Sequence, residues 1–210
     1  MTRLAIALLL APLLAPGAAI AQPAPAQPAP EAIGPWQLSC VTDRMTDRTA
    51  CILRHRDWVE RPSVGVGLAF EILDRGGRMV PAVTARDLSL DSVSRGLLAV
   101  AGSAQLRLGS NAMMEMPCGL EGRSLICTPR AADTARAAQE LPTAERALVR
   151  MAGLGSNSNA ATAPAELRLS DTAAAIERLR SRQPAGSAAA PPEPGLDLGG
   201  MLGRLQQLMR

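Results

Sequence analysis

Between residues 34 and 182 the chain alternates apolar and polar positions over short runs, the spacing of half-buried β-strands. Residues 36–40 and 51–56 form two such runs, and a polar turn over 42–49 separates them. Two strands joined in this way form a hairpin. The pattern therefore predicts a hairpin in which Cys40 and Cys51 face each other.

The same pattern continues through the rest of this body. Apolar runs predict a long strand over 64–73, a turn over 74–77, and shorter strands over 79–84, 86–91, 97–101 and 104–108. Residues 118–127 predict a second hairpin, and 145–152 and 165–169 predict a pair of late strands. Many short strands with Gly and Pro turns favour an antiparallel β-sandwich with two or three short helices.

Two of these helices follow from composition and capping. Residues 131–140 are alanine-rich, and Pro142 should end that helix because proline cannot continue a helical ladder. A second helix should begin after Ser170 or Asp171 and run to about residue 182. We expect Ala174, Ile176 and Leu179 to face the core.

The two ends of the chain have a different composition from the body. Residues 1–21 resemble a cleavable signal peptide, with Arg3, an apolar run over 4–14 and a small-residue cleavage site at 19–21. Residues 22–33 and 183–195 are Pro/Ala linkers, expected to be extended and unpacked. Residues 196–210 have helical periodicity. The domain proper is therefore expected at 34–182, in a periplasmic or secreted protein.

Charge and aromatic content exclude one class of partner. The formal net charge is only +3, all the basic residues are arginine, and Tyr is absent. Arginines between 44 and 61 alternate with acidic residues, which indicates a solvated mixed-charge surface. Nucleic-acid binding requires unbalanced positive charge and stacking aromatics, so we expect no nucleic-acid partner. Trp36 and Trp58 are expected to anchor the core near the first cysteine pair.

The four cysteines fall in two close pairs, Cys40 with Cys51 and Cys118 with Cys127. An even number of cysteines in an exported chain predicts disulfides, and four cysteines allow three connectivities. Proximity favours a bridge within each predicted hairpin. Neither pair has metal-ligand spacing and the chain has one histidine, so a zinc site is not expected.

The opening of the body, Gly34-Pro35-Trp36-Gln37-Leu38-Ser39-Cys40 followed by Cys51, resembles the invasion-associated locus B family of exported bacterial proteins, mainly alphaproteobacterial. The later segment from Cys118 to Cys127 is similar to that family's second cysteine hairpin. The resemblance covers about 34–182. It implies a β-sandwich with no known catalytic residues, and a family name that comes from host-cell entry by a few pathogens.

Few residues offer candidate chemistry. His55 lies between two arginines in a strand and has no serine-hydrolase motif around it, so we expect an exposed, non-catalytic side chain. Met113, Met114 and Met116 are weak candidates for a Cu(I) site, and otherwise fill an aromatic-poor core. The Gly-x-Gly at 65–67 lacks the context of a phosphate loop. No cofactor and no metal are expected.

The tail offers a candidate surface for a partner. Its apolar stripe could dock in a groove of a protein or envelope component, or contact a membrane surface. The stripe consists of Leu198, Met201, Leu202, Leu205 and Leu208. The leading hypothesis is a non-enzymatic exported protein that binds or scaffolds an unidentified partner. The alternatives are a periplasmic copper-handling protein and an enzyme with an unrecognised site.

Overall fold

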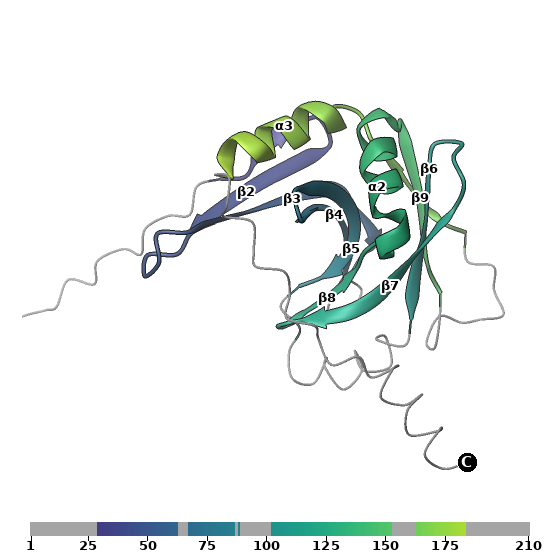
Figure 1. Ribbon diagram of the computed structural model, residues 1–210, viewed down its shortest axis with the longest axis horizontal. Coiled ribbons are helices and arrows are strands. Elements are labelled where there is room, and N and C mark those ends of the chain that lie inside the picture. Colours follow the sequence, from purple (N-terminus) through teal and green to yellow (C-terminus); the bar gives the residue numbers. More distant parts are fainter. Residues whose placement is uncertain (1–28, 63–66, 87, 89–101, 153–162, 184–210) are drawn as a thin grey trace, which may run out of the picture.

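The computed structural model describes residues 29–62, 67–86, 88, 102–152 and 163–183, and the fold is mainly antiparallel β with short helices, as predicted (Figure 1). The strands are β1 (Glu31–Ile33), β2 (Trp36–Thr42), β3 (Thr49–Glu60), β4 (Leu68–Arg75), β5 (Arg78–Ala85), β6 (Ser103–Leu108), β7 (Met114–Glu121), β8 (Ser124–Cys127), β9 (Arg146–Ala152) and β10 (Ala165–Arg168). The helices are α2 (Ala131–Glu140), the single 3₁₀ turn η1 (Leu141–Thr143) and α3 (Thr172–Arg182).

The strands form one ten-stranded sheet in the order β1-β2-β3-β4-β5-β8-β7-β6-β9-β10. A sheet of this size accumulates the right-handed twist of its strands and curls. The curl brings β10, at one end of the order, against β3 near the other end. The two layers of the expected sandwich are thus two arms of a single curled sheet (Figure 1).

Both helices pack against this curled sheet. Helix α2 packs on β5, and α3 packs on β2, β3 and η1. The core between helices and sheet is largely aliphatic, with Trp36 and Phe70 as its fully buried aromatic side chains. Their ring centroids lie 6.1 Å apart. Trp36 donates its indole N–H to Thr172 Oγ1 at 3.2 Å, which ties β2 to the first turn of α3.

Most element boundaries predicted from the sequence are confirmed. Helix α2 spans the predicted residues and stops at Glu140, and η1, with Pro142, follows. The late strands pair as β9 and β10, with Leu167 opposite Ala147. The long strand expected over 64–73 is shifted, because β4 begins at Leu68 and continues to Arg75, while residues 64–66 lie outside the described residues.

Several predictions are wrong. The last residues of the expected N-terminal linker, Glu31–Ile33, form β1, because they find ladder partners on β2. Arg86 and Leu88, expected in a strand, have no strand conformation, and the rest of 86–91 and all of 97–101 fall outside the described residues. In α3, Ala174 is exposed and Ala175 is buried, because Thr172 already faces inward and helical spacing then selects positions 175, 176 and 179.

Candidate interaction site

Both predicted disulfides are present and join directly opposed residues. Cys40 pairs with Cys51 across β2 and β3, and Cys118 with Cys127 across β7 and β8. The connectivity favoured by proximity is confirmed. Because all four cysteines are bridged, the chain has no thiol for catalysis or for metal binding.

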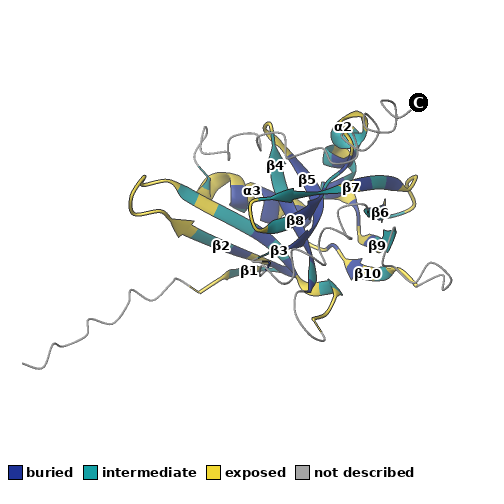
Figure 2. Cartoon of the chain, turned by 90° about the horizontal axis from the view of Figure 1, so that it is seen from below, coloured by how far each residue is buried: buried dark blue, intermediate teal, exposed yellow. Residues whose placement is uncertain are grey.

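The first disulfide sits in a segment that projects from the domain, residues 39–52, which we call the ribbon (Figure 2). On one side, β1 pairs only with Trp36–Leu38 of β2. On the other side, the described pairing of β3 with β4 starts at Leu53. Among the described strands, the ribbon therefore pairs only with itself, and both of its backbone edges are open.

A polar network holds the tip of the ribbon in one conformation. Asp43 Oδ1 accepts the Met45 backbone N–H at 2.8 Å, and Asp43 Oδ2 accepts the Thr46 hydroxyl at 2.9 Å. These bonds, the one from Met45 first, lower the pKa of Asp43 below its usual range. Asp47 adopts a left-handed conformation with φ of 53°. The tip is therefore an ordered turn that aspartates at 43 and 47 favour.

This ordered tip presents apolar side chains to solvent. Met45 is 91% exposed and Val41 is 54% exposed, and they are among the few large exposed hydrophobic residues of the described chain. Arg44 and Arg48 flank Met45 in sequence. An exposed methionine beside arginines, on a pre-organised turn, has the composition of the centre of a protein interface.

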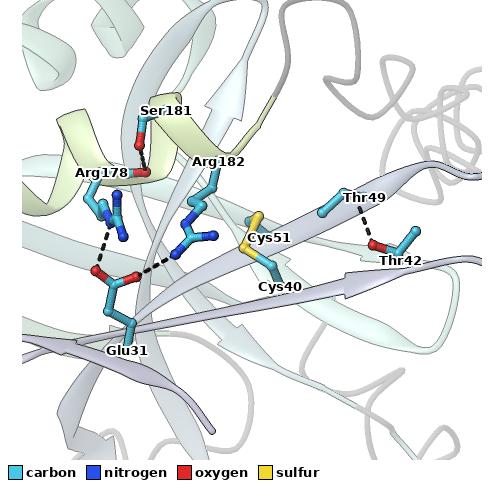
Figure 3. The surroundings of a disulfide bond; sticks show 8 residues. All are labelled: Glu31, Cys40, Thr42, Thr49, Cys51, Arg178, Ser181 and Arg182. Carbon is cyan, nitrogen blue, oxygen red and sulfur yellow. Dashed lines mark hydrogen bonds and ion pairs between the residues drawn. A yellow bond between two sulfur atoms is a disulfide. The ribbon is translucent and has the colours of Figure 1, made fainter. Parts of the chain in front are cut away.

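The base of the ribbon is clamped to helix α3. Glu31 of β1 accepts hydrogen bonds from Arg178 Nε at 2.7 Å and from Arg182 Nη2 at 3.4 Å (Figure 3). The bond from Arg178 is the main cause that lowers the pKa of Glu31. The C-terminal turn of α3 thus lies beside the Cys40–Cys51 bridge, and the ribbon extends beyond the support that the helix provides.

His55 is buried, so the prediction of an exposed side chain is wrong. Its Nε2 lies 2.9 Å from the Arg168 carbonyl oxygen, and its Nδ1 accepts the Asp57 backbone N–H at 3.1 Å. The ring also meets Trp36 edge-on, with centroids 5.3 Å apart. Strand alternation could have revealed this, because His55 shares a face with Leu53 and Cys51. His55 ties β3 to β10, and neither ring nitrogen is left to accept a proton from a serine.

An open depression of about 930 Å³ lies beside Asp57 and Arg168, the two residues whose backbone groups bond to His55. Ser170, which precedes α3, lines it together with charged side chains from three segments: Asp57, Glu145, Arg146, Glu166, Arg168 and Asp171. Arg146 and Glu166 lie 3.6 Å apart and are both more than half exposed. His55 does not line this depression and both of its ring nitrogens are occupied, so His55 does not act there as a base.

The methionines do not form one group. Met114 and Met116 are buried on the core face of β7, and Met113, just before the strand, is 52% exposed. Two of the three thioethers therefore fill the core. In the described ranges, no group of three or more His, Cys, Asp or Glu side chains is arranged to hold a metal ion.

Trp58 is not a core anchor, in contrast to the prediction. It is half-buried on the face of β3 opposite to Trp36, and the Arg54 guanidinium stacks on its ring at 3.8 Å. Opposite Arg54, the Glu71 carboxylate is 1% exposed and accepts hydrogen bonds from Arg86 at 2.6–3.0 Å. Burial lowers the pKa of Arg54. Trp58 follows Arg54 by four residues, so strand alternation already places both side chains on the same face, away from the core.

The remaining candidates lie outside the described residues. These are the signal peptide at 1–21, Gly65 of the Gly-x-Gly, and the tail stripe of Leu198, Met201, Leu202, Leu205 and Leu208. Within the described part of the chain, no helix has the length and apolarity of a membrane span. Comparisons with protein-family models, curated proteins and solved structures find no match to this chain.

Proposed function

We propose that this chain is an exported, non-enzymatic protein of the invasion-associated locus B type, which binds or scaffolds a partner at the cell envelope or outside the cell. The observation that carries this proposal is the ribbon. It projects from the domain, its tip is ordered by Asp43, and it presents Met45 and Val41 to solvent. Exposed apolar residues held in a fixed geometry lose little entropy when a partner covers them.

The proposed location has independent support. Two disulfides indicate an oxidising, exported environment. The signal-peptide pattern at 1–21 supports export with a leader that is then cleaved. The family resemblance over 34–40 supports the cell envelope or the medium as the destination. The amphipathic tail is a second candidate contact, for a protein or for a membrane surface.

Capture from solubilised envelope fractions tests the proposal. The oxidised protein is immobilised and compared with a Val41→Ser, Met45→Ser double variant and with Met113→Ser. Met113 is a matched control, because it is an exposed methionine far from the ribbon in sequence and outside any strand. We expect captured partner to decrease at least tenfold in the double variant only. Equal capture by all three proteins would refute a role for the ribbon.

A further inference from the structure

The open edge of β2 has hydrogen-bonding groups whose direction follows from the register. The Asp43 N–H donates to the Arg48 carbonyl at 2.8 Å, so Asp43 and Arg48 are a hydrogen-bonded pair. Such pairs alternate with non-hydrogen-bonded pairs along an antiparallel ladder. The opposed pairs Thr42–Thr49 and Cys40–Cys51 are therefore non-hydrogen-bonded. The backbone N–H and C=O groups of Cys40 and Thr42 consequently point away from β3.

The next residue of this series shows what these outward groups can do. Leu38 has the same orientation as Cys40, and it pairs with Glu31 of β1. Strand β1 extends no further along this edge, because Pro30 fixes φ at about −65°, far from the value of about −140° in an antiparallel strand. Ala29 and Pro30 are exposed and have no strand conformation. Beyond Glu31, no described residue pairs with Cys40 or Thr42 along this edge.

The edge is also rigid and partly apolar. The disulfide at Cys40 and the hydrogen bond between the Thr42 and Thr49 hydroxyls, 2.9 Å long, hold the two strands together at the positions whose backbone groups point away from β3. Between them, Val41 projects to one face and is 54% exposed. An added strand would thus find two sets of backbone partners and one apolar contact at a pre-formed surface.

We propose that β2 binds an extended peptide segment of a partner protein by strand addition, along Cys40–Thr42 and in line with β1. The proposal rests on the proposed function and names its binding mode. The peptide pairs its backbone with Cys40 and Thr42 over about five residues, at about 3.4 Å per residue. It places an apolar or β-branched side chain beside Val41, and its paired positions contain no proline, which lacks the N–H group.

A second copy of this chain fits the edge less well. In an antiparallel pair of two β2 strands centred on Val41, Asp43 of one copy would stand opposite Ser39 of the other. Arg44 would then fall opposite Leu38, whose outward backbone groups already pair with Glu31 of β1. The tip of each ribbon would therefore collide with β1 of the other copy, which favours a short peptide over a second ribbon.

The test compares Thr42→Pro with Thr42→Val. Both variants lose the hydroxyl bond to Thr49, and proline alone also removes the outward N–H while it leaves the β2–β3 ladder intact. The probe is a random 12-residue peptide library displayed on phage, selected on the oxidised wild-type protein. Synthetic versions of the enriched peptides are then measured by fluorescence anisotropy. We expect affinity for Thr42→Pro to be about tenfold lower than for Thr42→Val, since a backbone hydrogen bond is lost and its acceptor is left unpaired.

Amide hydrogen exchange on the wild-type protein keeps the test decisive if Thr42→Pro folds poorly. A bound peptide should slow exchange at Cys40 and Thr42, while Val41, whose N–H faces Ala50, should change little. No enriched peptide, equal affinities for the two Thr42 variants, or unchanged exchange at Cys40 and Thr42 would each overturn strand addition. If envelope capture still depends on Met45 and Val41 in that case, the proposed function stands and only the binding mode fails.

Discussion

The ion pair between Glu71 and Arg86 should be the most destabilising charged contact to break in the described part of the chain. The Glu71 carboxylate is 1% exposed, and Arg86 reaches both of its oxygens. An Arg86→Ala substitution would leave a buried carboxylate without its main partner. Removing one partner of a fully buried pair costs about 3–5 kcal/mol.

Two features reduce this magnitude. The Arg86 side chain is 31% exposed, so water can reach the carboxylate once the guanidinium is gone. Arg54, directly opposite Glu71, also remains as a nearby positive charge. We therefore expect Arg86→Ala to lower the free energy of unfolding by about 2–3 kcal/mol. For a domain of this size, each kcal/mol shifts Tm by about 2–4 °C, so the expected loss is about 5–10 °C.

Thermal unfolding by circular dichroism, with the disulfides intact, measures the effect. Arg146→Ala is the matched control, because Arg146 forms an exposed pair with Glu166 and should contribute about 0–1 kcal/mol. A Glu71→Met, Arg86→Ala double variant should recover at least half of the lost Tm, since no charge then remains buried. A double variant no more stable than Arg86→Ala, or equal effects of the two arginine substitutions, would refute the reasoning.

Three further outcomes are expected. Replacing Cys118 and Cys127 together by serine should lower the free energy of unfolding by about 3 kcal/mol in the chain-entropy account of a loop of this length, as measured by urea titration. The lowered pKa of Asp43 means that its ionised form stabilises the folded tip above its ordinary pKa of 3.8, and that this contribution is lost as pH falls through the lower, folded-state pKa. The NMR signal of the Met45 amide should report that loss, and Asp43→Asn should abolish its pH dependence. Deleting residues 196–210 should leave Tm unchanged if the tail serves interaction, whereas a large decrease would show that it belongs to the core.

The sequence predicted well those elements whose signal is local. Alternation and turn residues located both cysteine hairpins, and alanine content located α2 to the residue. Where the environment depends on distant segments, prediction failed. His55 was assigned to the surface from its arginine neighbours, although alternation places it on the face of Leu53. Its contact with Arg168 could not be predicted, because the curl of the sheet creates it. Trp58 was assigned to the core from its size, although its even spacing from Arg54 places it on the other face of β3.

The first disulfide crosses the projecting ribbon, whereas Cys127 of the second disulfide is buried in the core. A two-stranded hairpin without packing on a third element is at best marginally stable in water. Over residues 39–52, neither β1 nor β4 pairs with the ribbon, and α3 ends beside the Cys40–Cys51 bridge. Cys40 and Cys51 still pack against the core, so a cross-link between them keeps the ribbon in register at the point where packing ends. The same bridge fixes the backbone of Cys40, whose outward N–H and C=O groups would pair with a partner strand. The first bridge therefore orders the proposed binding edge, and we expect its reduction to weaken partner binding before it unfolds the domain.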